Sequence, residues 1–270
     1  MKDLYCLSIQ NISIDQAWHL LESVGIEILY SNEDEDQFEI YALIPSKDLL
    51  SLFDWIKEIS PYTLPSIDWD EQWAMHAQNF HEGYASIDFS EFGRKKAELK
   101  LQPGPGFGDL SHPTTRLMLK LLAKYLNKQT VIDIGCGSGI LALAALRMDA
   151  TYATGIDIDE SAVHHSYLNA CLNQLEEKCH FCTPEQFKWL LTSQPTLLLM
   201  NMIQSEQKIA WSSLSSLHAQ PGECLTSGIR KEERETYLSM TSNWGWKLKE
   251  EEEEEGWVAF YFVLQNMIHQ

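Results

Sequence analysis

A glycine-rich loop directly after an apolar strand constrains the fold of this chain more than any other feature. The segment Val131-Ile132-Asp133-Ile134-Gly135-Cys136-Gly137-Ser138-Gly139 predicts a buried strand that turns sharply into a helix. Glycines in such a turn adopt unusual backbone dihedral angles and let a ligand approach the backbone. The N-terminus of the following helix points at the same place. The loop therefore predicts an α/β domain with a cofactor site at this turn.

An acidic residue at the end of the next predicted strand favours a cofactor that contains a nucleoside. Asp157 stands twenty-two residues after Gly135, within Gly155-Ile156-Asp157-Ile158-Asp159. A carboxylate in this position accepts hydrogen bonds from both hydroxyls of a ribose. The alternation continues along the chain, with strands predicted at 130–134, 152–157, near 180, 196–201 and 222–227, and helices near 139–148 and at 160–174, 204–217 and 231–243.

The spacing of the glycines separates two classes of cofactor. The dinucleotide fingerprint is G-x-G-x-x-G, and its third glycine would fall on Ile140. Asp133 stands two residues before the first glycine, where its carboxylate can receive a free amino group. S-adenosylmethionine has such a group and nicotinamide cofactors lack it. The loop therefore favours S-adenosylmethionine, with Asp133, Gly135 and Gly137 as cofactor-binding residues, over a nicotinamide oxidoreductase.

The first 67 residues predict a separate small α+β domain. Strands are predicted at 4–9, 26–30 and 38–44, helices after Ser13 and Ser46, and a possible last strand between Pro61 and Pro65. The order β-α-β-β-α-β is that of a ferredoxin-like module. Residues 68–83 predict a helical linker rich in acidic and aromatic residues, and residues 84–270 form the larger domain.

The charge of the chain bears on its partners. Acidic residues number 39 and Lys plus Arg 20, which gives a formal net charge of −19. A nucleic-acid groove needs a basic face, so direct DNA or RNA binding is disfavoured and a basic protein or cationic small molecule is favoured. No apolar run is long enough to span a membrane, and the start lacks a signal core, so we expect a cytoplasmic protein. The run Glu250–Glu255 is interpreted as a solvated hairpin tip between strands at 244–249 and 257–264.

Metal ligation is not expected. Cys179 and Cys182 form a C-x2-C pair, but no second pair stands at zinc spacing and His180 lies between them. The six scattered cysteines do not suggest a disulfide framework in a chain of this length. His164 and His165 are interpreted as surface residues, and His112 as a packing or turn residue.

Several motifs together resemble one family. The glycine loop, Gly155–Asp159 and Asn169-Ala170-x-x-Asn173 resemble class I S-adenosylmethionine-dependent methyltransferases. Four further stretches are similar to the ribosomal protein L-eleven methyltransferases (the PrmA family): Pro103–Gly108 with His112-Pro113-Thr114-Thr115-Arg116-Leu117, Asn201-Met202-Ile203, Ser227-Gly228-Ile229 and Glu255-Gly256-Trp257. This resemblance implies a Rossmann-like domain, in which a mostly parallel seven-stranded sheet has an antiparallel last strand.

The resemblance also implies an activity and a site. The activity is methyl transfer from S-adenosylmethionine to Lys side chains or the N-terminal amine of a ribosomal protein, with the small N-terminal domain recognising the substrate. Thr115, Gly135, Asp157 and Asn201 match cofactor-contacting positions, and Phe107 matches an aromatic lid. Asn201 and Phe107 are the candidate catalytic residues. Because the methyl of a sulfonium is already activated, no general base or metal is assigned.

One departure from the family pattern leaves alternatives open. Asp109-Leu110 stands where the family has Thr-Gly, a change that bears on the substrate rather than on the reaction. The alternatives are a methyltransferase for another protein or a small amine, and a module that binds the cofactor without turnover.

Overall fold

The computed structural model describes residues 3–34, 37–63, 68–77, 79–93, 98–108, 110–188, 196–220 and 222–264. Contacts between residues divide the chain into two compact units, residues 1–67 and residues 68–270. Each unit has a hydrophobic core of its own. Within the described part of the chain, every helix is too short or too polar to cross a bilayer.

The first unit is a four-stranded antiparallel sheet with one helix and one 3-10 turn. Its elements are β1 (Asp3–Ile9), α1 (Ile14–Ser23), β2 (Glu27–Asp34), β3 (Gln37–Ile44), the 3-10 helix η1 (Lys47–Leu52) and β4 (Ile56–Pro61). The strand order β2-β3-β1-β4 is that of the predicted ferredoxin-like module. The Ser13 side chain caps α1 by accepting from the Gln16 amide, at 3.3 Å.

Two predictions for this unit were wrong in detail. The last strand ends at Pro61, because β4 pairs with β1 through residues 56–61, whereas it was predicted to lie between Pro61 and Pro65. The second predicted helix is only the short 3-10 helix η1. Residues 64–67 lie outside the described residues.

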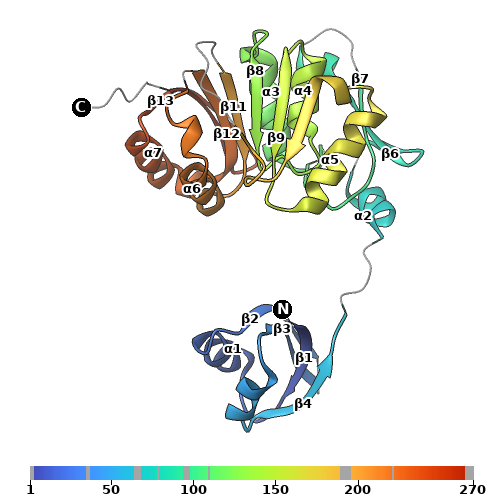
Figure 1. The fold of residues 1–270 in the computed structure, drawn as a ribbon, viewed down its shortest axis with the longest axis vertical. Coiled ribbons are helices and arrows are strands. Elements are labelled where there is room, and N and C mark those ends of the chain that lie inside the picture. The colour runs from blue at the N-terminus through green and yellow to red at the C-terminus, as the bar shows by residue number, and fades with distance from the viewer. Residues whose placement is uncertain are drawn as a thin grey trace. The chain divides into compact units, whose positions relative to one another are not determined.

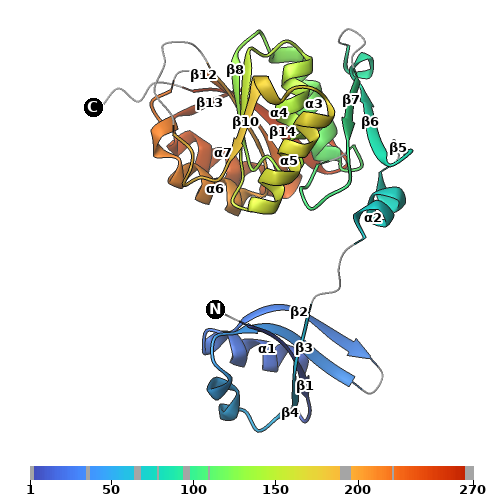
Figure 2. The ribbon, with the colours of Figure 1, turned by 45° about the vertical axis from the view of Figure 1, so that its right-hand side comes forward.

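A helix and a small three-stranded sheet begin the second unit. Helix α2 (Trp69–His76) is followed by β5 (Phe80–His81), β6 (Tyr84–Asp88), the 3-10 helix η2 (Phe89–Phe92) and β7 (Glu98–Leu101), and the three strands pair antiparallel. Trp73 of α2 is buried in the core of this unit. Figure 2 shows β7 beside the helices that cover the large sheet.

The large sheet has seven strands in the order β10-β9-β8-β11-β12-β14-β13. They are β8 (Thr130–Ile134), β9 (Tyr152–Ile156), β10 (Cys179–Cys182), β11 (Thr196–Asn201), β12 (Gly222–Arg230), β13 (Trp246–Glu254) and β14 (Trp257–Leu264). The first five are parallel and β14 runs antiparallel to both neighbours. This arrangement confirms the predicted mostly parallel sheet with an antiparallel last strand, and Figure 1 shows it.

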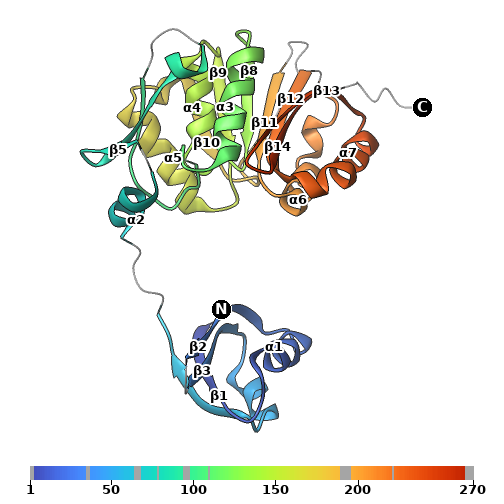
Figure 3. The same cartoon turned by 180° about the vertical axis from the view of Figure 1, so that it is seen from behind.

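Helices cover the two faces of this sheet. They are α3 (Pro113–Tyr125), α4 (Ile140–Arg147), α5 (Glu160–Leu172), α6 (Gln204–Ser213) and α7 (Arg234–Asn243), with 3-10 turns η3 (Glu176–Lys178), η4 (Ser215–Leu217) and η5 (Lys231–Glu233). One apolar cluster joins the sheet to α3, α4 and α5, and a second joins it to α6 and α7. Alternate residues of a strand enter each cluster: Leu197 and Leu199 the first, Leu198 and Met200 the second. Figure 3 shows α3 and α4 side by side over one face.

The glutamate run is part of a strand, so its interpretation as a hairpin tip was wrong. Glu250–Glu254 continue β13 and pair with β14 along residues 257–261. Cationic side chains from other elements offset the repulsion within the run: Lys124 of α3 pairs with Glu250, and Arg234 of α7 pairs with Glu251 at 2.7 Å. The tight turn is formed by Glu255 and Gly256, both with positive φ. The segment after β10 contains a turn at 184–186, and residues 189–195 lie outside the described part.

Candidate functional site

A cavity of about 540 Å³ opens at the carboxyl ends of the central parallel strands. Its lining includes the ends of β8, β9 and β11, the loop 105–107 and residues along α6 from Glu206 to Ser213. Open parallel sheets bind ligands at this edge, and the volume is that of a small-molecule site. The cavity brings together Phe107, Gly135, Gly137, Asp157 and Asn201, five of the seven residues predicted for the site.

The glycine loop is shaped by the close approach of another loop. Gly135, Gly137 and Gly139 all have positive φ, between 54° and 80°. A Cβ on Gly137 would lie 2.3 Å from the Phe107 carbonyl oxygen, and that oxygen accepts from the Ser138 amide at 2.8 Å. Gly137 therefore lets the loop that carries Phe107 pack directly on the backbone after β8. The sequence indicated only their approach to a ligand.

Asp157 connects the end of β9 to the glycine loop. Its Oδ2 accepts from the Gly137 amide at 2.9 Å, and its Oδ1 accepts from the Asp159 amide at 3.1 Å. The residue is half-buried and lines the cavity. Since each carboxylate oxygen has a second lone pair, both oxygens can still accept from a ligand hydroxyl.

Asp133 is buried behind the cavity rather than in its lining. It is 1% exposed, and its Oδ2 accepts from the Ala142 amide near the start of α4, at 3.1 Å. Burial raises the pKa of this carboxyl to about 8, with a smaller contribution from the negative charge of Asp157. Its second oxygen has no hydrogen-bond partner among the described residues.

Thr115 and Asn201 also carry buried oxygens that are unpaired within the described part of the chain. Thr115 is fully buried on the first turn of α3, outside the cavity lining. Asn201 ends β11 and lines the cavity. Native proteins rarely leave buried polar atoms unpaired, so these oxygens suit a ligand that brings donors to the site.

The residues present fit S-adenosylmethionine. Asp157 offers acceptors for hydroxyl groups and Asn201 an unpaired acceptor for an amino group. The exposed side chains of Ile158 and Ile203 provide apolar surface for an aromatic base. Among the described residues, no group of three or more potential metal ligands is found. Cys179 and Cys182 lie on β10, and burial raises the pKa of both thiols.

Aromatic side chains form one wall of the cavity. The rings of Phe107 and His112 meet edge to face at 5.7 Å, and those of His112 and Trp257 at 4.9 Å. The Arg230 guanidinium stacks over Trp257, 3.9 Å from its centroid. His112 caps α3 by accepting from the Thr114 amide at Nδ1, so its predicted packing or turn role is confirmed.

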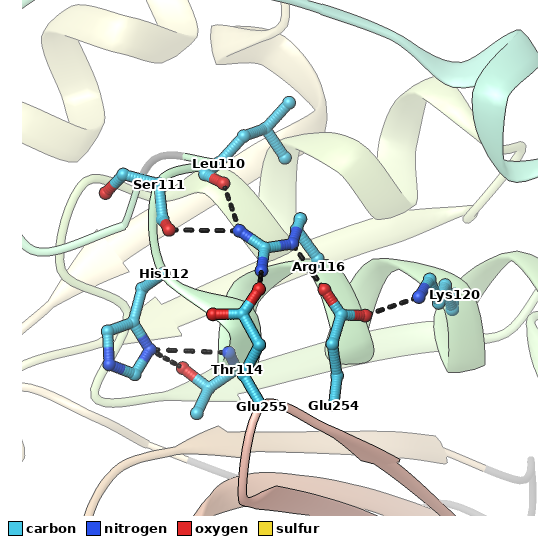
Figure 4. A network of polar contacts seen from close by, with 8 residues as sticks. All are labelled: Leu110, Ser111, His112, Thr114, Arg116, Lys120, Glu254 and Glu255. Carbon is cyan, nitrogen blue, oxygen red and sulfur yellow. Dashed lines mark hydrogen bonds and ion pairs between the residues drawn. The ribbon is translucent and has the colours of Figure 1, made fainter. Parts of the chain in front are cut away.

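Arg116 connects this wall to the turn between β13 and β14 (Figure 4). It donates to the carbonyl oxygens of Leu110 and Ser111, both at 3.0 Å. It also pairs with Glu254 at 2.6 Å and with Glu255 at 2.8 Å. The turn leads directly into Trp257, and residues 110–111 lie between Phe107 and His112. The Arg116 guanidinium therefore holds both segments that carry the aromatic rings of the cavity wall. Asp109, where the sequence departs from the family pattern, lies outside the described residues.

The prediction that His165 is a surface residue was wrong. It is 3% exposed and its ring contacts the backbone of the loop 102–106, whereas the neighbouring His164 is exposed as expected. No local sequence signal distinguishes the two residues. The difference follows from the loop, which lies sixty residues earlier in the chain and crosses α5 at His165.

Comparisons with known proteins find similar sequences over most of the chain. A family model described as "Ribosomal protein L11 methyltransferase (PrmA)" matches residues 10–265. The ribosomal protein L11 methyltransferase of Neisseria meningitidis serogroup B is 39% identical over 160 residues, which cover 59% of this chain and 52% of that protein. The protein of the same name from Hahella chejuensis is 33% identical over 196 residues, covering 71% and 66%. The chain thus spans about half to two thirds of the curated relatives it matches.

A solved structure supports the fold. The ribosomal protein L11 methylase of Lactobacillus delbrueckii subsp. bulgaricus superposes with a TM-score of 0.51 and 24% sequence identity. The match covers 61% of this chain and 84% of that one.

Proposed function

Since the chain belongs to the ribosomal protein L11 methyltransferase (PrmA) family, we propose that it transfers methyl groups from S-adenosylmethionine to amines of a ribosomal protein. One observation carries the proposal beyond membership of the family. Phe107, Asp157 and Asn201 line a single cavity at the carboxyl ends of the parallel strands. The resemblance matches Asp157 and Asn201 to cofactor-contacting positions and Phe107 to an aromatic lid.

The proposed cofactor site combines residues in the cavity with two residues behind it. Asp157 receives the ribose hydroxyls, while Gly135 and Gly137 let the cofactor lie against the backbone. The Thr115 hydroxyl and the Asp133 carboxyl lie outside the cavity lining, and each has a buried oxygen with no partner among the described residues, which suits a donor of the bound cofactor.

The residues of the chain position the amine and exclude water. When bound, S-adenosylmethionine supplies a methyl group that its sulfonium already activates. Asn201 accepts a hydrogen bond from the target amine through its side-chain oxygen and holds the nitrogen lone pair toward the methyl. Phe107, which is 57% exposed, covers the mouth of the cavity. No side chain is assigned as general base; the amine enters the reaction uncharged.

The charge of the chain supports a cationic substrate. The net charge is −19, and the Glu206 carboxylate lies in the cavity lining. A negative field raises the rate at which a basic protein or a lysine-rich segment encounters the site. Substrates named for the relatives are ribosomal proteins, and we assign the same class to this chain. The first unit, with a core of its own, is proposed to recognise that protein.

Labelled S-adenosylmethionine with separated ribosomal proteins tests the function. We expect label in one ribosomal protein, on lysine side chains or the N-terminal amine, as located by mass spectrometry. The Asn201→Leu variant should lose most turnover and keep its fold, whereas the exposed-site control His164→Ala should match the wild type. Labelling only of small amines would overturn the proposed substrate. If the protein binds S-adenosylmethionine but labels no amine, the alternative of a module that binds the cofactor without turnover would be favoured.

A further inference from the structure

The buried imidazole of His165 joins helix α5 to the loop that forms part of the cavity wall. Its Nδ1 accepts from the Gly106 amide at 3.1 Å, and its Nε2 lies 2.8 Å from the Gln102 carbonyl oxygen. Asn169, one turn further along α5, fastens the same loop by accepting from the Gln102 amide at 2.9 Å. Two side chains of one helix thus hold the start of the loop.

The two shortest contacts of the ring require one protonation state. The third contact, between Nε2 and the Asn169 Nδ2 at 3.3 Å, is longer, and that Nδ2 donates to the Ser138 carbonyl oxygen at 2.9 Å. A backbone amide only donates, so Nδ1 must carry a lone pair. A carbonyl oxygen only accepts, so Nε2 must carry the hydrogen. Both conditions hold together only in the neutral imidazole with its hydrogen on Nε2. A proton added to Nδ1 would break the Gly106 hydrogen bond, because the N–H groups of Gly106 and of the ring would then point at each other.

Close packing leaves the ring no other position. A Cβ on Gly104 would lie 2.5 Å from the imidazole, so only glycine lets the loop pass over it. The Trp73 ring of α2 meets it edge to face at 6.3 Å. The groups in contact with the ring are uncharged, and the nearest titratable side chain is His164 on the same helix. Burial is the largest influence and lowers the pKa of His165, which favours the neutral form, while the hydrogen bond to the Gln102 carbonyl acts in the opposite direction.

The position of Gly106 controls a wall of the cavity. Pro105, Gly106 and Phe107 all line it, and the Phe107 carbonyl oxygen accepts from the Ser138 amide in the glycine loop. We propose that His165 is a positioning residue that holds the 102–108 loop against the cavity, and that it does so only as the neutral imidazole. The consequence for cofactor binding rests on the proposed function; the consequence for the loop does not.

Amide-resolved hydrogen exchange of Gly106 tests the position of the loop in the full-length protein without any ligand. His165→Phe keeps a ring against Trp73 but removes the acceptor, while His165→Gln supplies an acceptor and a donor on adjacent atoms. The cost of leaving a buried donor unpaired corresponds to a factor of about five to a hundred in the equilibrium between the closed and open loop. We therefore expect Gly106 exchange in His165→Phe to be faster by that factor. His165→Gln should restore most of the protection, and His164→Phe should leave it unchanged.

A pH series separates positioning from general support of the fold. In the wild type, Gly106 protection, corrected for intrinsic exchange, should be constant down to the ordinary histidine pKa of about 6.5 and should fall only at lower pH, because burial lowers the pKa of His165. His165→Gln should show no such step. Amides in the centre of β8 should not change in any variant, which shows that the fold persists. Unchanged Gly106 protection in a folded His165→Phe protein, or the same pH step in His165→Gln, would overturn the proposal.

Two further measurements complete the test. Gly104→Ala places a methyl group against the imidazole, forces the loop away and should accelerate Gly106 exchange when it is the only substitution. In the double variant with His165→Ala, which makes room for that methyl group, Gly104→Ala should accelerate Gly106 exchange much less. Calorimetry with S-adenosylmethionine should show weaker binding by His165→Phe than by His165→Gln. If the wild type binds no S-adenosylmethionine while Gly106 exchange responds as expected, the proposed function fails and the role of His165 stands.

Discussion

The Asp157 carboxylate accepts a hydrogen bond from the Gly137 amide, with 2.9 Å between Oδ2 and the nitrogen. This bond joins two signals that the sequence offers separately: the glycine loop after β8 and the acid at the end of β9. It holds the carboxylate at the cavity before any ligand contact is made. A ribose that binds there meets an acceptor whose position is already fixed, which lowers the entropy lost on binding.

Replacing Asp157 should weaken the binding of S-adenosylmethionine. We expect Asp157→Ala to lose about 1.5–3 kcal/mol of binding free energy, the range for hydrogen bonds to a charged group. Titration calorimetry measures the change. Glu160→Ala removes a nearby exposed carboxylate and serves as the matched control. Equal affinities for the wild type and a folded Asp157→Ala protein would show that Asp157 does not bind the ribose.

Arg116 should affect turnover more than stability. Arg116→Met keeps the aliphatic stem but releases Leu110 and Ser111 from the turn at Glu254 and Glu255. Because the guanidinium is partly exposed, we expect a loss of only about 1–2 kcal/mol of unfolding free energy. The aromatic wall of Phe107, His112 and Trp257 should then be less well ordered, and kcat should fall.

A matched variant on the same helix separates the two effects. Lys124→Met breaks an ion pair with Glu250 of β13, away from the cavity lining. Its thermal midpoint should fall slightly and its turnover should stay at the wild-type value. A kcat in Arg116→Met equal to that in Lys124→Met would show that Arg116 does not position the wall.

Much of the fold follows from local sequence signals. Strand β11 has a continuous apolar run, β8 is followed by the glycine loop, and Asp159 caps the start of α5. The run Glu250–Glu254 carries no such signal, because five like charges favour a solvated segment. It forms a strand through pairing with β14 and through cations on α3 and α7, which are distant in sequence.

The site divides in the same way. Gly135, Asp157 and Asn201 could be found because each stands at the end of a predicted strand, and parallel strands end at one edge of the sheet. The burial of His165 could not be found, because it depends on where the loop 102–106 crosses α5. The glycine spacing could not show that Gly137 accommodates the Phe107 carbonyl.

The ionisation of Asp133 should make stability depend on pH. Burial raises the pKa of this carboxyl to about 8 in the folded chain, against about 3.9 in the unfolded chain. Between these values the folded state binds the extra proton, so the free energy of unfolding falls as pH rises from about 4 to about 8. Asp133→Asn has no carboxyl to ionise and should flatten this part of the profile.

Denaturant titrations at a series of pH values measure this profile. The difference in unfolding free energy between Asp133→Asn and the wild type should shift in favour of the variant as pH rises, and should level off above about pH 8. The exposed-acid control Glu160→Gln should follow the wild type. A pH-independent difference between Asp133→Asn and the wild type would mean that the buried carboxyl does not ionise in this range.

Removing residues 1–67 should separate cofactor binding from action on a protein. The first unit has its own core, which includes Leu7, Leu21 and Ile40, and the whole cavity lies in residues 105–257 of the second unit. The remaining chain should fold and bind S-adenosylmethionine with the affinity of the full-length protein. On the ribosomal protein, kcat/KM should fall at least about tenfold, which corresponds to about 1.4 kcal/mol of transition-state stabilisation. A short peptide around the methylated amine makes the control, because both proteins should methylate it equally. Wild-type kcat/KM on the intact ribosomal protein would show that the first unit does not recognise it.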